Sequence, residues 1–337
     1  RSRATDDRVP TPMMAEHYAQ RASAGLIISE ATVISEEANG YLNTPGLFTD
    51  AQVEGWKAVT GAVHERGGLI VAQLWHVGRV SHPDLLQGKT PVSASNVQQA
   101  GQVSLLRPKR DYVVPRALEI AEIKAIVEQF KQAAIRAKDA GFDGVELHAA
   151  NGYLIDQFLQ SSTNHRDDEY GGSVENRARL LLEVMDALIE VWGAGRVGVH
   201  LAPRGDEHDM GDNDPRETFG YALEALGQRK IAFFFTREYL ADDSISEYLK
   251  TRSGGVPYIA NMKLSREDAV NMLTSGRADA VSFGKAYIAN PDLFERLVQD
   301  APLNELIFDN MIGVQTAAGY IDYPSLQDQS AHERVQH

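Results

Sequence analysis

Residues 145–153, with the sequence Val-Glu-Leu-His-Ala-Ala-Asn-Gly-Tyr, carry three side chains that could do chemistry together. His148, Asn151 and Tyr153 follow a short apolar segment typical of a buried strand. The end of a parallel strand is where α/β folds place catalytic groups. Histidine and asparagine can both donate a hydrogen bond to one carbonyl or nitro oxygen, and a nearby phenol can supply a proton. The alternative is a loop histidine satisfied by the backbone, and the spacing alone leaves both interpretations open.

Composition limits the classes of protein to consider. The 337 residues are 43% apolar and 24% charged, which is enough apolar material for a sizeable core. The net charge of -14 repels phosphate backbones and anionic lipids, so we expect neither nucleic acid nor a membrane as a partner. The absence of cysteine excludes disulfides, thiolate nucleophiles and cysteine-ligated metals. Residues 1–7 lack the apolar segment of a signal peptide, and we expect a cytoplasmic protein.

Short segments rich in β-branched residues alternate with amphipathic ones along the chain. The helix predicted over 120–140 has apolar residues every three or four positions and meets Gly141 at its end. Ser173 and Ser265 are suited to be N-caps of two further helices. The predicted strands are 26–33, 69–75, 144–148, 196–201, 231–236, 256–261 and 278–283, and the other predicted helices are 174–192, 216–228 and 265–276.

This alternation indicates one parallel α/β domain over residues 1–337. Seven strands in this rhythm favour a (β/α)₈ TIM barrel that is short by one strand. The interval of about 88–116 predicts an inserted loop or hairpin. A doubly wound dinucleotide fold would need a glycine-rich first turn, and the sequence has no G-x-G-x-x-G motif.

Six motifs occur in an order and spacing that resemble one known family. They are residues 73–79, 145–153, 170–177, 283–284, 288–293 and 319–324. Together they resemble the old yellow enzymes, and most of all the bacterial N-ethylmaleimide, xenobiotic and morphinone reductases. The resemblance implies an FMN-containing (β/α)₈ barrel that takes hydride from NADH or NADPH. It also implies reduction of activated C=C bonds in enals, enones and maleimides, and action on nitro compounds.

The resemblance assigns roles to the residues that would meet the substrate. His148 and Asn151 would hold the substrate oxygen, and removal of one such donor typically costs about 10²–10³ in rate. Tyr153 would give the proton. Tyr41 matches a substrate-side aromatic residue, and Trp75 would form part of the pocket wall.

The resemblance also implies contacts with the flavin rings. Gln73 would lie against the pyrimidine ring, Ala31 against the isoalloxazine and Tyr320 beside the flavin. His200 stands on the fifth strand, where many relatives have arginine. A histidine there could donate a hydrogen bond to the flavin and, if protonated, could stabilise its reduced form.

The flavin phosphate would be bound after the last two strands, where barrels commonly bind phosphate. Gly284 and Lys285 match that position, and Asn261 ends the preceding strand. Relatives usually have arginine in place of Lys285. Lysine neutralises a phosphate as a point charge rather than as a two-pronged donor.

The first barrel strand and its leading hairpin, which relatives carry, have no counterpart in this sequence. A barrel without one strand has two unpaired edges. The alternative to the enzyme is therefore a flavin-poor or silent barrel that acts as a binding or assembly protein. A weaker alternative is a metal-dependent hydrolase using His76, His148 and His200, although no metal-binding motif is present. The sequence leaves open whether the protein is a monomer or a homo-oligomer.

Overall fold

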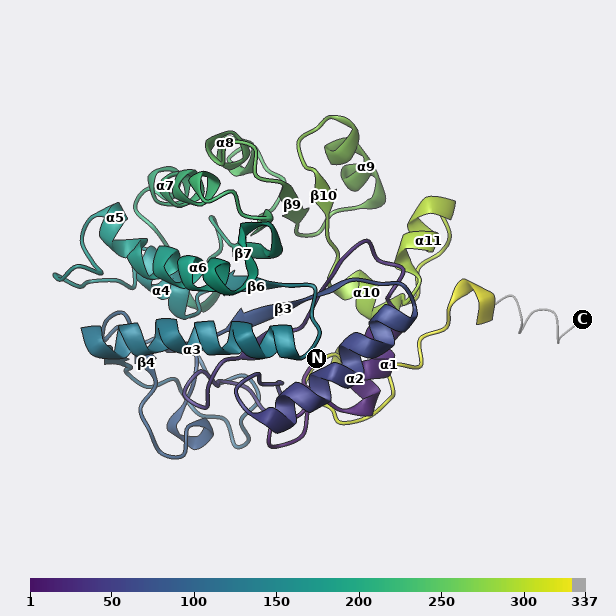
Figure 1. The fold of residues 1–337 in the computed structure, drawn as a ribbon, viewed down its shortest axis with the longest axis horizontal. Coiled ribbons are helices and arrows are strands. Elements are labelled where there is room, and N and C mark those ends of the chain that lie inside the picture. The colour runs from purple at the N-terminus through teal and green to yellow at the C-terminus, as the bar shows by residue number, and fades with distance from the viewer. Residues whose placement is uncertain (329–337) are drawn as a thin grey trace, which may run out of the picture.

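A curled parallel sheet is the centre of the computed structural model, which describes residues 1–328 (Figure 1). Within that range the strands follow the order β1, β3, β6, β7, β8, β9, β10. Strand β2 also pairs with β3, closer to the carboxyl end of β3 than β1 does. Parallel pairing gathers all the carboxyl ends of the strands at one face. The strands are β1 Ile27–Ile28, β2 Thr32–Val33, β3 Ile70–Trp75, β6 Gly144–Ala149, β7 Val197–Leu201, β8 Phe233–Arg237, β9 Tyr258–Asn261 and β10 Ala280–Val281.

Helices connect these strands and form an arc around the outside of the sheet (Figure 1). Helix α3 packs on β3 and β6, and α6 packs on β6 and β7. The helices are α1 Pro12–Ala19, α2 Asp50–Glu65, α3 Ile120–Asp139, α4 Leu154–Leu159, α5 Val174–Arg177, α6 Arg179–Trp192, α7 Pro215–Gln228, α8 Ser246–Arg252, α9 Arg266–Thr274, α10 Lys285–Ala289 and α11 Leu293–Gln299. The fold prediction of a parallel α/β barrel sheet is confirmed.

The predicted helix starts are confirmed by their caps. The Ser173 hydroxyl accepts from the Asn176 N–H, and the side chains of Ser265 and Asp268 form a reciprocal capping box. The single helix predicted over 174–192 is divided into α5 and α6 at Ala178. It ends as predicted at Gly193, whose φ of 75° is accessible to glycine at little cost.

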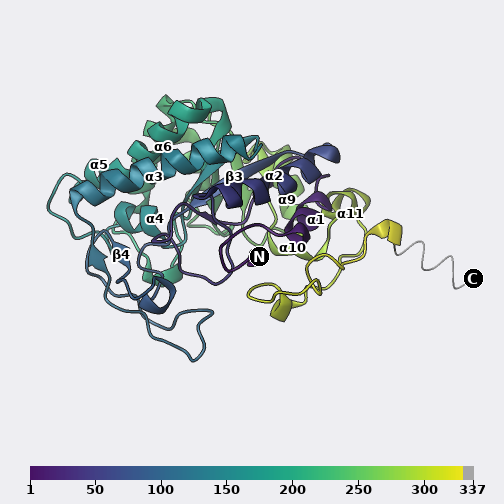
Figure 2. The same ribbon diagram turned by 60° about the horizontal axis from the view of Figure 1, so that its bottom comes forward.

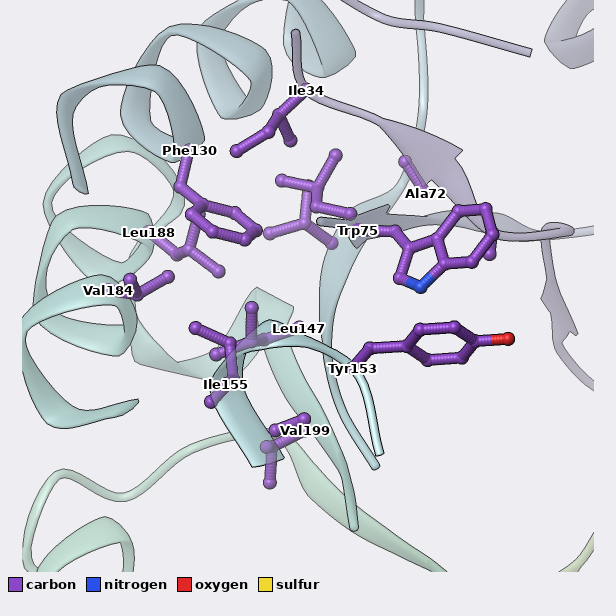
Figure 3. Packing of buried hydrophobic residues seen from close by; sticks show 14 of the residues in the cluster. Ile34, Ala72, Trp75, Phe130, Leu147, Tyr153, Ile155, Val184, Leu188 and Val199 are labelled. Atoms are coloured by element: carbon purple, nitrogen blue, oxygen red, sulfur yellow. The ribbon is translucent and has the colours of Figure 1, made fainter. Parts of the chain in front are cut away.

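Alternation along each strand separates two apolar layers. One face of the sheet packs against the helices, with Leu147 and Val199 buried near Phe130 and Val184 (Figure 3). The inner face carries a smaller cluster that includes Val71, Phe233, Phe235 and Ile259. Residues 144–149 are all buried, and the polar Glu146 and His148 alternate with the apolar Val145, Leu147 and Ala149.

The strand predicted over 26–33 is interrupted in its middle. The Gln73 N–H donates to the Ser29 hydroxyl (3.0 Å), where regular pairing would use a backbone carbonyl. The Ser29 and Thr32 hydroxyls both donate to the Glu30 carbonyl oxygen (2.9 Å each). Side-chain hydrogen bonds of this kind compete with a strand ladder, and they divide the segment into β1 and β2.

The predicted insertion has little regular structure. Strand β4 Val92–Ser93 pairs in parallel with β5 Arg116–Ala117, so the two ends of the insertion do not form a hairpin. Between them, one antiparallel bridge joins Gln102 to Asp111.

The sheet is open between β1 and β10, since no pairing within residues 1–328 joins these two strands. This agrees with the prediction of a barrel short by one strand. Beside the opening, the first residues of the chain lie against its last described segment (Figure 2). The Ser2 carbonyl accepts from Gln315 Nε2 (2.6 Å), and His17 stacks on Tyr320 with ring centroids 3.9 Å apart. In the described part of the chain, each helix is too short or too polar to cross a membrane.

Candidate active site

The carboxyl ends of neighbouring strands bring together residues predicted for the substrate side and for the flavin side of the site. His148 on β6 is in register with His200 on β7, and their ring centroids lie 5.0 Å apart. Trp75 ends β3, and its ring centroid is 6.1 Å from that of His148. All three side chains are buried. The sheet therefore places donors from three strands in one small region.

The His148 ring is an uncharged donor. Its Nδ1 accepts a long hydrogen bond from the Ala150 N–H (3.4 Å), so in the neutral ring the proton lies on Nε2. Burial lowers the pKa of His148 to about 3, and the charge of Arg1 contributes to this. At neutral pH the ring can thus donate through Nε2 without bringing a positive charge.

A tight turn follows β6 and presents Asn151. Its φ of 58° lies in the left-handed region, and Gly152 follows with a φ of 79°. The Asn151 carbonyl contacts His208 Nδ1 (2.6 Å), and the Gly152 N–H donates to Asp156 (2.9 Å). In the side chain, Oδ1 accepts from Arg237 Nη1 (3.1 Å). The Asn151 NH₂ group therefore remains available as a second hydrogen-bond donor beside His148 Nε2.

Tyr153 is the N-cap residue of α4 and lies at the edge of the aromatic cluster. Its ring packs edge-on against Trp75, with centroids 4.9 Å apart (Figure 3). Its hydroxyl is 2.8 Å from the Tyr41 hydroxyl. Burial, with a smaller contribution from Tyr41, raises the pKa of Tyr153 well above its ordinary value. The phenol therefore keeps its proton at neutral pH.

Tyr41 and Trp75 form a nearly parallel pair with ring centroids 5.4 Å apart. The Arg1 guanidinium lies over both rings, 4.9 Å from the Tyr41 centroid and 6.0 Å from that of Trp75. These aromatic faces can thus bind a flat or cationic group. Four of the five residues predicted on the substrate side are joined by ring contacts: His148, Tyr153, Tyr41 and Trp75. Asn151 joins them through His208, which contacts its carbonyl and lies 5.1 Å from the Tyr153 ring between centroids.

Gln73 has a partner that the sequence reasoning missed. Its Nε2 donates to Glu146 Oε1 (2.7 Å), which leaves Gln73 Oε1 as an acceptor. Glu146 is fully buried on β6, and burial raises its pKa to about 8. The sequence does indicate Glu146 as a site residue, because it lies two positions before His148 and so on the same inward face of the strand.

The other predicted cofactor residues lie on β7 and near the open edge. His200 faces the site, and Ala31 is buried between β1 and β2. Asn261 ends β9, and its Nδ2 donates to the Ser282 carbonyl (2.9 Å). Gly284 precedes α10, where Lys285 Nζ lies 5.3 Å from the Phe308 ring centroid. Tyr320 is buried and stacked on His17.

Several buried polar atoms around these strand ends have no partner within residues 1–328. They are Trp75 Nε1, both ring nitrogens of His200, Ser282 Oγ and the Tyr320 hydroxyl. A buried donor without a partner typically lowers the stability of the folded protein by about 1–3 kcal/mol. Because buried polar groups are generally hydrogen-bonded, these atoms are suited to pair with a bound ligand. A flat cofactor with several carbonyl and ring-nitrogen groups, as FMN has, fits this set. Burial lowers the pKa of His200 well below its ordinary value, so we expect it to act as a neutral donor.

The structure does not support the metal-hydrolase alternative. In residues 1–328 no three histidine, cysteine or acidic side chains come together as a metal-binding group. His76 Nδ1 instead accepts from the Gly78 N–H (3.0 Å), and burial lowers the pKa of His76 to about 3.

Several known proteins are similar to this chain in sequence or in fold. A probable flavin mononucleotide-dependent alkene reductase of Leishmania infantum is 42% identical over 338 residues, covering 96% of this chain and 91% of that protein. An old yellow enzyme homologue from Zymomonas mobilis has a TM-score of 0.92 at 45% identity, covering 96% of this chain and 93% of that one. Morphinone reductase in complex with tetrahydroNAD has a TM-score of 0.92 at 45% identity, covering 97% and 91%. Residues 1–304 match the family model for NADH:flavin oxidoreductases and NADH oxidases. The chain therefore belongs to the NADH:flavin oxidoreductase / NADH oxidase family, as its resemblance to the old yellow enzymes predicted.

Proposed function

We propose that this protein is an FMN-dependent oxidoreductase that uses NADH or NADPH to reduce C=C bonds next to a carbonyl or nitro group. Enals, enones, maleimides and nitro compounds are the substrate classes. The observation that carries this proposal is the pair of uncharged donors at the end of β6, His148 Nε2 and the Asn151 amide. Family membership supports the flavin and its nicotinamide reductant.

The two donors bind the oxygen that activates the alkene. Because both are neutral and oriented before substrate arrives, they stabilise negative charge as it develops on that oxygen. Tyr153 then delivers its phenolic proton to the α-carbon. Bound FMN supplies the hydride for the β-carbon. Tyr41 and Trp75 hold the planar part of the substrate against their rings.

The polar groups without a partner within residues 1–328, together with the residues near the open edge of the sheet at β9 and α10, would hold the cofactor. Gln73 Oε1 is fixed as an acceptor by the bond from Nε2 to Glu146, which suits an N–H group on the flavin. His200 and Ala31 complete the contacts with the rings, and Tyr320 lies beside them. The phosphate is neutralised by Lys285, with backbone contacts from Gly284 and the end of β9 at Asn261.

A spectral experiment tests the proposal. The purified protein should be yellow or should take up FMN stoichiometrically. It should bleach without oxygen on adding NADPH or NADH and recover its colour on adding N-ethylmaleimide or 2-cyclohexenone. The double variant His148→Ala/Asn151→Ala should still bleach but recover its colour far more slowly. A protein that takes up no FMN would overturn the proposal and would favour the binding or assembly role.

A further inference from the structure

Arg237 approaches the substrate side of the site from two strands away. It is the last residue of β8, which pairs with β7, which in turn pairs with β6. Its Nη1 donates to Asn151 Oδ1 at 3.1 Å, and the same nitrogen forms an ion pair with Glu207. The Arg237 side chain is 28% exposed, so it is partly shielded from water. One guanidinium thus joins the β6 turn to the loop that follows β7.

The contact determines which way the Asn151 amide faces. A side-chain amide has an accepting oxygen and a donating nitrogen at nearly equivalent positions, and their assignment follows from the neighbours. A guanidinium has only donors. The atom that faces Arg237 must therefore be Oδ1, and Nδ2 with its two hydrogens must face the other way. Without Arg237 the amide could turn and present an acceptor in place of a donor.

We propose that Arg237 is a positioning residue that holds the Asn151 amide with its NH₂ group toward the substrate oxygen. The inference rests on the proposed function, in which Asn151 and His148 share that oxygen. The inference adds to the proposed function that Arg237, a charged residue on β8, sets the orientation of the Asn151 NH₂ donor from outside the turn that carries Asn151.

Two further contacts support this role. The backbone carbonyl of Asn151 is held by His208, a neighbour of Glu207, so the same loop positions both ends of the residue. A cation on Oδ1 also polarises the amide, and polarised hydrogen bonds in series strengthen one another. The Glu207 carboxylate balances the charge of Arg237, so the Arg237–Glu207 pair orients the Asn151 donor without adding net charge.

The test compares ketone binding in FMN-loaded variants. Cyclohexanone is saturated at the positions that would be reduced, so calorimetry measures its dissociation constant without turnover. Arg237→Met should weaken cyclohexanone binding about tenfold, because the donor loses its orientation. Arg237→Lys should recover part of this loss, since lysine is also a donor only. Arg229→Met, which removes an arginine paired with Asp186 on the outer helices, should change binding by less than about twofold.

A double-mutant cycle separates positioning from other effects. In an Asn151→Ala background, Arg237→Met should cause no further loss, because Arg237 acts through Asn151. An equal loss in both backgrounds, or no loss in either, would overturn the inference. FMN content and the rate of bleaching by NADPH report separately on the proposed function. Should Arg237→Met fail to retain FMN, the milder Arg237→Gln takes its place in the same cycle with the same expectation.

Discussion

The hydroxyls of Tyr41 and Tyr153 lie 2.8 Å apart, although the two residues are separated by 112 positions in the chain. Tyr41 comes from the loop after β2, and Tyr153 begins α4. Both rings pack on Trp75 and both are buried. The Tyr153 hydroxyl therefore shares a hydrogen bond with that of Tyr41, in which either phenol can be the donor.

The first prediction concerns this pair. Tyr153→Phe should slow reoxidation of the reduced protein by 2-cyclohexenone by about 10²-fold, because a general acid typically contributes 10²–10⁴. Its bleaching by NADPH should be unchanged, and stopped-flow absorbance measures the two steps separately. Tyr170→Phe, which removes a phenol bonded to Glu183, is the control. Equal slowing of both steps would argue against a proton-donor role.

The raised pKa of Tyr153 predicts how alkene reduction responds to pH. Because burial disfavours the phenolate, the donor stays protonated beyond the ordinary phenol value of about 10. We expect no loss of the reoxidation rate from Tyr153 ionisation below that pH. A decline near neutral pH that disappears in Tyr153→Phe would contradict the burial argument.

Lys285 should distinguish FMN from riboflavin. Lys285→Met should weaken FMN binding about tenfold or more, because a charge-assisted contact with the phosphate is lost. Riboflavin has no phosphate, so its affinity should change little in the same variant. Fluorescence titration of the flavin-free protein measures both constants. If both affinities fell equally, Lys285 would support the structure of the site rather than bind the phosphate.

Glu146 predicts a pH-dependent difference in stability. Its pKa is about 8 in the folded protein and about 4.5 ordinarily, so from pH 4.5 to 8 the unfolded chain releases a proton that the folded protein keeps. The contribution of Glu146 to stability is therefore present at low pH and lost as the pH rises through this window. Glu146→Gln removes the effect while keeping an acceptor for Gln73. As the pH rises from 5 to 8, the unfolding free energy of the variant minus that of the wild type should increase by about 1.4 kcal/mol per pH unit.

Urea unfolding at several pH values between 5 and 8 measures this difference. A gap between Glu146→Gln and the wild type that stays constant with pH would show that Glu146 is ionised in the folded protein. The measurement also bears on the site, because an ionised Glu146 beneath Gln73 would place a negative charge next to the proposed flavin.

Gly198 on β7 should be intolerant of a larger side chain. A Cβ added there would overlap the Phe233 ring, which packs on the inner face of the sheet. Gly198→Ala should destabilise the protein by about 1–3 kcal/mol through overpacking. Phe233→Leu should cost less in the Gly198→Ala background than in the wild type, since the two residues are in contact. Additive effects would mean that the ring moves aside without cost.

The order of strands and helices could be predicted from the sequence because it depends on local patterns. Ser173, Gly193 and the Ser265 capping box are local signals, and each ends or begins a helix as predicted. The interruption of the first strand was not predicted. It depends on the Ser29 hydroxyl meeting the Gln73 N–H, and those residues are 44 positions apart.

By itself the sequence determined the fold class, the family and the strand end that carries His148, Asn151 and Tyr153. Apolar periodicity and motif spacing follow from neighbouring residues, and parallel strands must bring their carboxyl ends together. Only the tertiary structure decided the partners: Glu146 for Gln73, Tyr41 for Tyr153 and Arg237 for Asn151. Each pair joins segments far apart in the chain. Strand register, loop path and burial therefore set the protonation and orientation of these groups, which local sequence patterns do not encode.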